Sequence, residues 1–280
     1  MKNLLAISFL LLIVATGCKK KEIPSFKVMS FNLRYDTPND SINAWSNRKD
    51  AVADLVKFHE AEIVGVQEAL LHQLKDLEER LPDHSWLGVG RDDGIAKGEF
   101  SAILYNKHLF QVMDSGTFWL SPTPDVPSKG WDAAIVRVCT WAKMKNRHLG
   151  KDFYIFNTHY DHIGVEARTN SSKLIIEKVN EIAGELPVIL TGDFNSEPET
   201  KAYETLTEGL TDARSLSENP PYGPYGTWNG FDHNADLTRR IDYVFVNEKV
   251  LVRKYAVLSD ATENRYPSDH LPVMAEVMFR

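Results

Sequence analysis

PVILTGDFN, residues 187–195, joins an apolar run to a polar turn. Pro187–Leu190 is short and wholly apolar, which is typical of a buried strand, and Asp193 and Asn195 follow it closely. The end of a strand holds a side chain rigidly at the rim of a sheet, where a site can be built. Taken alone, a Gly-Asp-x-Asn segment is more often only a turn, so its meaning depends on the rest of the chain.

The same arrangement recurs outward from this stretch. Asn32, Glu68 and His159 stand at the ends of other expected strands. Asp269 and His270 come just before the last expected strand, and Asp242 begins a strand instead of ending one. Each has an ordinary alternative, since Glu68 could cap the next helix and Asp242 could pair with a neighbouring arginine. A purely structural explanation would have to apply to every one of these residues separately. A single shared site accounts for all of them together, so the set favours a shared site.

Strands outnumber helices along the chain. From residue 26 onward we expect about ten strands, one of them at 133–144, and three or four helices. Consecutive strands with short turns favour antiparallel pairing, and two groups of strands with helices beside them suggest two packed sheets with helices outside. The pattern shows no repeat and no internal linker, so residues 26–280 are expected to form one domain.

The composition is that of an ordinary globular protein. The chain has 280 residues, 43% of them hydrophobic, and a formal net charge of −7. An acidic chain with no basic block beyond its N-terminal tail counts weakly against a nucleic-acid substrate. There are two cysteines, and Cys139 lies in an apolar run, so a disulfide framework is excluded. We expect a monomer.

The N-terminus has the pattern of an export signal. Leu4–Val14 is apolar but too short to span a bilayer comfortably. Small residues then precede Cys18, which resembles a bacterial lipoprotein signal; a plain secretory signal with an incidental cysteine is the alternative. We therefore expect a signal peptide at 1–17, a tether at 18–25 and lipidation of Cys18. The protein would be exported and anchored to a bacterial membrane, on its periplasmic or cell-surface face.

The residue types fit a site for a hard cation and a reactive water. Glu68 offers a carboxylate oxygen and Asn32 an amide oxygen, and Mg²⁺ prefers oxygen ligands. Because Mg²⁺ usually keeps several waters, few acids suffice; Mn²⁺ and Ca²⁺ stay open. Asp193 can deprotonate or position an attacking water, and Asn195 can hold that water or a phosphate oxygen.

Two histidines complete a site suited to phosphate esters. His159 and His270 can donate to phosphoryl oxygens, where charge builds up in the transition state. Asp242 or Asp269 could accept from the second nitrogen of His270 and so select its tautomer. The combination predicts hydrolysis of a phosphate ester.

This set, in this order, resembles the endonuclease/exonuclease/phosphatase superfamily, which includes DNase I-like nucleases, inositol polyphosphate 5-phosphatases, bacterial sphingomyelinases and deadenylases. The resemblance covers essentially all of residues 26–280. The motifs that carry it are SFNL at 30–33, VQE at 66–68, NTH at 157–159, TGDFN at 191–195, RIDY at 240–243 and SDH at 268–270.

The resemblance implies a fold and a reaction. The fold is an α/β (α+β) class, four-layer α/β/β/α sandwich with two mainly antiparallel sheets face to face and outer helices. The reaction is divalent-metal-dependent hydrolysis of a phosphate ester by in-line attack of an activated water. The implied roles are metal binding by Glu68 and Asn32, contact with the water by Asp193 and Asn195, contact with the phosphate by His159 and His270, pairing with His270 by Asp242, and a place at or beside the metal for Asp269.

Several loops resemble a narrower branch, nearer the deadenylase-like and secreted bacterial members, and should rim the site. They contain Trp119, Trp131 and Trp228. Packing is the commoner fate of a tryptophan, but Trp119 and Trp228 are candidate stacking platforms for the substrate. Arg137 and Arg168 are candidate phosphate contacts.

Two alternatives stay open. A metallo-β-lactamase-type zinc hydrolase carries an HxHxDH pattern that nearly recurs as NTHYDH at 157–162, but Asn157 replaces the first histidine, and zinc prefers imidazole or thiolate to an amide. A non-catalytic surface lipoprotein could use the same fold as a binding module, although the residues that catalysis needs are all present. The sequence does not choose among nucleic acid, phospholipid and sugar phosphate, or between diester and monoester.

Overall fold

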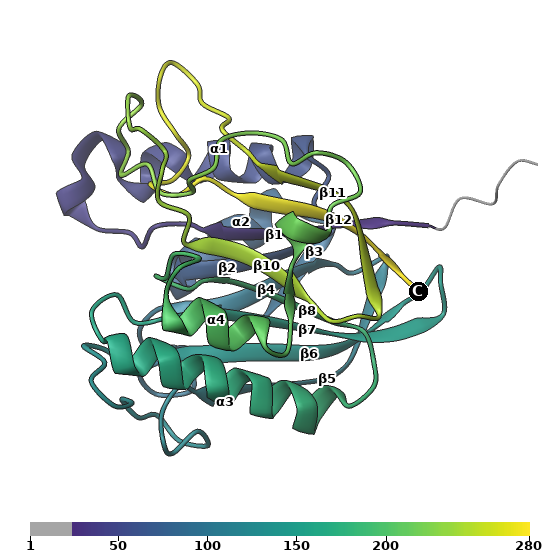
Figure 1. The fold of residues 1–280 in the computed structure, drawn as a ribbon. Helices are drawn as coiled ribbons and strands as arrows, with labels where there is room; N and C mark the ends of the chain where they lie inside the picture. The colour runs from purple at the N-terminus through teal and green to yellow at the C-terminus, as the bar shows by residue number, and fades with distance from the viewer. Residues whose placement is uncertain (1–23) are drawn as a thin grey trace, which may run out of the picture.

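The computed structural model describes residues 24–280, which form two six-stranded sheets and the helices around them (Figure 1). The predicted signal peptide at 1–17, Cys18 and most of the predicted tether at 18–25 lie outside the described residues. Within residues 24–280, no helix combines the length and the apolar character needed to cross a membrane.

The first sheet has the order β11-β12-β1-β2-β4-β3. β1 and β2 are parallel, and the other neighbours are antiparallel. The carboxyl ends of β1 and β2 therefore lie side by side, with Asn32 opposite Gln67 and next to Glu68. The strands are β1 (Phe26–Asn32), β2 (Ile63–Ala69), β3 (His84–Leu87), β4 (Phe100–Asn106), β11 (Val250–Val257) and β12 (Val273–Phe279).

The second sheet has the order β5-β6-β7-β8-β10-β9. β7 and β8 are its parallel pair and place His159 opposite Asp193. β10 runs antiparallel to β8 and places Asp242 opposite Asp193 on the other side. The strands are β5 (Phe110–Trp119), β6 (Val138–Asn146), β7 (Lys151–His159), β8 (Val188–Asp193), β9 (Thr211–Asp212) and β10 (Asp242–Val246).

Figure 1 shows helices on the outer faces of the two sheets, and apolar cores join these layers. One lies between the sheets and includes Val28 of the first and Ile155 of the second. Another packs α1 (Trp45–Phe58) and α2 (Leu71–Arg80) on the outer face of the first sheet. A further core packs α3 (Val165–Ala183) and α4 (Lys201–Thr207) on the outer face of the second. This order of layers confirms the predicted four-layer sandwich.

The prediction of a strand beginning at residue 133 is wrong. The backbone N–H groups of Ala134 and Ile135 donate to the Asp161 carboxylate, at 3.0 and 3.3 Å, so they are diverted from strand pairing. β6 begins only at Val138. Short elements that were not predicted are the 3₁₀ helix η1 (Pro38–Asn43), β9 and α5 (Ala213–Leu216).

Candidate active site

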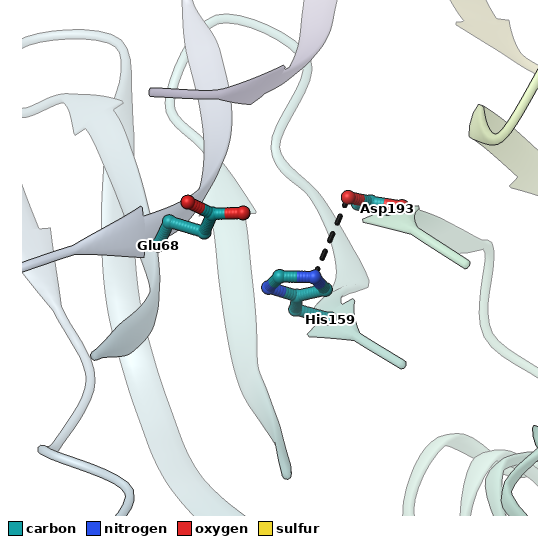
Figure 2. Close-up of side chains that lie close together, drawn as sticks. All are labelled: Glu68, His159 and Asp193. Atoms are coloured by element: carbon teal, nitrogen blue, oxygen red, sulfur yellow. Dashed lines mark ion pairs between the residues drawn. The ribbon is translucent and has the colours of Figure 1, made fainter. Parts of the chain in front are cut away.

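The polar residues at the strand ends converge between the two sheets. Asn32 Nδ2 donates to Glu68 Oε1 at 3.0 Å and to Asp193 Oδ2 at 2.9 Å, so one amide links the parallel pair of the first sheet to that of the second. Figure 2 shows Glu68 facing His159 and Asp193 across this gap. The convergence follows from the topology, because both parallel pairs present their carboxyl ends to the same place.

Asp193 lies at the centre of the site. Its Oδ2 is 3.4 Å from His159 Nε2 and 3.8 Å from His270 Nε2. On its other ring nitrogen, His270 Nδ1 lies 2.9 Å from Asp242 Oδ2. Thr227 Oγ1 donates to the same Asp242 oxygen at 2.6 Å. Asp242 is therefore the partner of His270 and holds its ring with Nε2 toward Asp193.

Asn195 closes the site beside His159. Its backbone N–H donates to Asp193 Oδ1 at 2.9 Å, and its Nδ2 lies 3.1 Å from His159 Nε2. Asn195 has a φ of 46° and Glu68 a φ of 62°. A left-handed backbone conformation is strained at residues other than glycine, and such residues cluster at functional sites. The conformations of Glu68 and Asn195 therefore support a functional role for both residues.

Two groups of side chains are close enough to share a divalent cation. Within each group the potential ligand atoms lie within 4.8 Å of one another; one group is Glu68, His159 and Asp193, and the other is Asp193, Asp242 and His270. Carboxylate oxygens with a single imidazole suit a hard or borderline cation. The donor set therefore fits a divalent metal ion.

The other two predicted metal ligands, Asn32 and Asp269, are not members of these two groups. Asn32 turns its amide nitrogen toward the carboxylates, while its Oδ1 accepts from the Arg34 backbone N–H at 2.9 Å. Asp269 lines the cleft, with its Oδ2 3.9 Å from Arg34 Nε. Asn32 thus holds the two acids in place, and metal binding by Asn32 and Asp269 stays a prediction.

Burial and nearby charges shift the pKa values of the two histidines in opposite directions. Although burial lowers it, the carboxylates of Asp242 and Asp193 raise the pKa of His270 well above its usual range. Burial and nearby arginines lower the pKa of His159 well below its usual range. Burial beside Asp242 raises the pKa of Asp193 to about 7. The surroundings therefore favour the charged form of His270 and the neutral form of His159, and such a difference in environment suits the two residues to different roles.

A cleft of about 490 Å³ opens onto these groups. Hollows of about 680 and 560 Å³ lie elsewhere, but neither is lined by the strand-end motifs. Of the predicted substrate contacts, Arg137 and Trp228 line the cleft. Trp228 is 38% exposed, whereas Trp119 is 6% exposed and donates its Nε1 to Arg91 O at 2.8 Å.

Arg168 is also absent from the lining of the cleft. Its Nη1 donates to the Asp161 backbone oxygen at 3.0 Å, which is a structural contact. The structure thus brings the predicted catalytic residues together with two of the predicted substrate contacts, Arg137 and Trp228. The other two predicted substrate contacts, Trp119 and Arg168, lie outside the cleft.

Sequence reasoning missed seven residues of the lining, and four of them are arginine, histidine or glutamate: Arg34, Glu99, His162 and Arg239. Arg34 directly follows the SFNL motif, and His162 lies three positions after His159. Glu99 directly precedes β4, so the placement before a strand that pointed to Asp269 and His270 could have pointed to Glu99 as well.

The zinc-hydrolase alternative does not fit the geometry. Asn157 is buried between the sheets, where its Nδ2 donates to Val66 O and Ala102 O. Asp161 accepts from backbone N–H groups, and His162 Nδ1 lies 3.2 Å from Arg137 Nη2. Among residues 24–280, no group of three potential ligands includes Asp161 or His162.

Comparison with known proteins agrees with this site. The model of the Endonuclease/Exonuclease/phosphatase family matches residues 29–270, and the chain belongs to this family. A family member from Bacteroides thetaiotaomicron is 44% identical, with a TM-score of 0.89 over 92% of this chain and 99% of its own.

The mannosyl-6-phosphatase Bt3783 of Bacteroides thetaiotaomicron is 43% identical, with a TM-score of 0.88 over 91% of this chain and all of its own (100%). The human Nocturnin catalytic domain is 20% identical and matches over 92% of this chain and 94% of its own, with a TM-score of 0.72, so it shares the fold. The protein is a phosphoesterase of this family by fold, motifs and site.

Proposed function

We propose that this protein is a divalent-metal-dependent phosphatase that releases inorganic phosphate from a monoester. The observation that carries the proposal is the meeting of Glu68, His159 and Asp193, whose ligand atoms lie within 4.8 Å of one another in an open cleft. The choice of a monoester over a diester is supported by the similarity to a mannosyl-6-phosphatase, which covers 91% of this chain.

The residues divide the work as follows. Asp193, with a pKa of about 7, can take a proton from the attacking water. Asn195 orients that water or a phosphate oxygen. His270, held cationic by Asp242, donates from Nε2 to a phosphoryl oxygen, where negative charge grows in the transition state. A divalent cation bound at Glu68 would supply further positive charge at the phosphoryl oxygen. We propose Mg²⁺ for this role, with Mn²⁺ or Ca²⁺ as alternatives.

Two lining residues extend the site toward the substrate. Arg137 and Trp228 are proposed substrate contacts, because both face the cleft. Arg239 lies over the exposed Trp228 ring, 5.0 Å from its centroid, and orients it.

Phosphate release from a panel of nucleotides, phospholipids and sugar phosphates, with and without Mg²⁺, tests the proposal. The parent should release phosphate only with a divalent ion, and chelation should abolish release reversibly. Glu68→Gln should lose activity at low Mg²⁺ and keep its unfolding midpoint. Metal-independent turnover, or full activity of Glu68→Gln, would refute the metal role; no release from any monoester would favour a diesterase or the non-catalytic binding module.

We also propose that the protein is exported and held at a bacterial membrane through a lipid on Cys18. The support is the apolar stretch at 4–14 followed by small residues and a cysteine. Cys18→Ala should move the protein from the membrane to the soluble fraction of its native host. A membrane-bound Cys18→Ala protein would overturn the anchor.

A further inference from the structure

Arg48 lies on α1 and contacts the loops that carry one side of the active site. It is 4% exposed and does not line the cleft. Its guanidinium donates to four backbone carbonyl oxygens. Nη1 donates to Leu33 O at 2.8 Å and to Pro267 O at 2.7 Å, Nη2 donates to Arg34 O at 3.2 Å, and Nε donates to Asn43 O. One buried side chain thus joins segments that are distant in the sequence.

Two of these segments lead to groups of the active site. The segment after β1 reaches the proposed metal ligand, because the backbone N–H of Tyr35 donates to Glu68 Oε2 at 3.1 Å. The segment that begins at Pro267 contains His270. Arg48 therefore links the side of the site that would hold the metal ion to the side that would contact the phosphate.

Arg48 also contacts the loop that carries Trp228. The ring centroid of Phe231, in that loop, lies 5.2 Å from Arg48 Cζ. The same loop is bonded to the segment that contains His270, since the backbone N–H of Asn229 donates to the backbone oxygen of Asp269 at 2.8 Å. The guanidinium of Arg48 is thus in contact with three loops that border the cleft.

Packing alone does not explain an arginine at this position. Burial lowers the pKa of Arg48 to about 10, because the charged form is unfavourable away from water. The four acceptors are carbonyl oxygens and none is a carboxylate. Apolar packing of α1 is supplied by residues such as Val52 and Val56. A guanidinium adds a rigid, planar fork of donors, which can hold several carbonyl groups in fixed positions.

We propose that Arg48 is a positioning residue of the active site, which fixes Glu68 and His270 at the separation that catalysis requires. It does not touch the substrate and acts through the loops whose carbonyl groups it holds. The kinetic consequence rests on the proposed phosphatase function. The inference goes beyond that function because it assigns a role in the reaction to a residue outside the cleft.

Kinetics of Arg48→Met test the positioning role. Methionine occupies similar space without donating, so kcat should fall about 10²-fold, the loss expected when reacting groups are misplaced by about 1 Å. KM should stay within about threefold of the parent, because the groups that line the cleft remain. Arg48→Lys keeps the charge without the fork and should lose kcat as well. A parental kcat in Arg48→Met, or in Arg48→Lys should the methionine variant not fold, would overturn the proposal.

Asn247→Ala is the matched control for a loss of stability without a loss of positioning. Asn247 follows β10 at the end opposite Asp242, where its Oδ1 accepts from the Val188 N–H at 3.0 Å and its Nδ2 donates to Leu186 O at 2.8 Å. The substitution should lower the unfolding midpoint in urea and keep kcat at the parental value. An equal loss of kcat in Asn247→Ala and Arg48→Met would reject a specific role for Arg48.

Hydrogen exchange separates failure of the positioning role from failure of the proposed function. In Arg48→Met, amide exchange should rise in peptides that cover 33–37, 226–231 and 266–271, and should stay at the parental rate in β7. If the parent releases no phosphate from any ester, the phosphatase proposal fails, but exchange still judges whether Arg48 holds the loops. Parental exchange in all three peptides would reject the positioning role even in an active phosphatase.

Discussion

Asn157 and His159 belong to the same strand, β7, two positions apart, and have opposite fates. Asn157 Oδ1 accepts from Gln67 Nε2 at 2.6 Å and from Thr191 Oγ1 at 3.0 Å, and its Nδ2 donates to two backbone oxygens of the facing sheet. His159 lines the cleft, and its Nε2 lies 3.4 Å from Asp193 Oδ2 and 3.1 Å from Asn195 Nδ2. A polar group whose partners lie in the facing sheet fastens the two sheets, whereas one that meets the other site residues at the cleft can take part in binding a ligand.

The same contrast holds for the regions around them. Gly65, Gln67, Asn157 and Thr191 form a polar layer inside the sandwich, and the strand-end residues form the reactive site next to it. Substitutions in the polar layer should therefore change stability, and substitutions at the strand ends should change activity.

The largest effect should come from Asp193→Asn. Loss of the proposed base should lower kcat by about 10²–10⁴-fold. Stability should hold or rise, because a buried carboxylate beside Asp242 is removed. Phosphate-release kinetics and urea unfolding measure the two effects separately. A destabilised variant with normal kcat would place Asp193 in the polar layer.

Asn157→Ala should show the opposite pattern. The change leaves buried groups of Gln67, Thr191 and two backbone carbonyls without their partner, so the free energy of unfolding should fall by about 3 kcal/mol. The kcat of the remaining folded protein should stay within about threefold of the parent, a margin near 0.6 kcal/mol. Unchanged stability in urea would show that this layer does not fasten the sheets.

Gly65→Ala sharpens the comparison. A Cβ at Gly65 would lie 2.0 Å from Thr191 Oγ1 and 2.6 Å from Asn157 Oδ1, so the sheets must separate locally. Overpacking of this kind should destabilise by about 2 kcal/mol. Asn157→Ala in the same chain should relieve part of the strain, and a double-mutant cycle by urea unfolding measures the coupling. Strict additivity would show that the two positions act separately.

The smallest effect should come from two tryptophans. Trp228→Ala should raise KM about fivefold, because it removes an exposed ring from the cleft. Trp119→Ala should instead lower the unfolding midpoint and leave KM unchanged, since Trp119 is buried and bonded to Arg91 O. Equal effects of the two substitutions on KM would contradict the assignment of Trp228 to substrate binding and of Trp119 to packing.

Much of the site could be predicted because strand ends are visible in sequence. The apolar run 187–190 and the polar turn after it identified Asp193 and Asn195, and the same pattern led to Glu68 and His159. Glu99 and His162 were missed because neither belongs to a motif that led to the site: Glu99 stands alone before β4, and His162 lies in the loop after NTH. The strand expected from residue 133 failed because a distant carboxylate, Asp161, captured its N–H groups.

The amino-acid sequence by itself determined the class of fold, the family and the set of residues able to bind a cation and a phosphate. Those properties are local, since they depend on apolar periodicity and on residue type at strand ends. Only the tertiary structure decided which polar groups are satisfied. Asn157 and His159 look alike in the NTH motif, and the facing sheet supplies partners for one and an open cleft for the other.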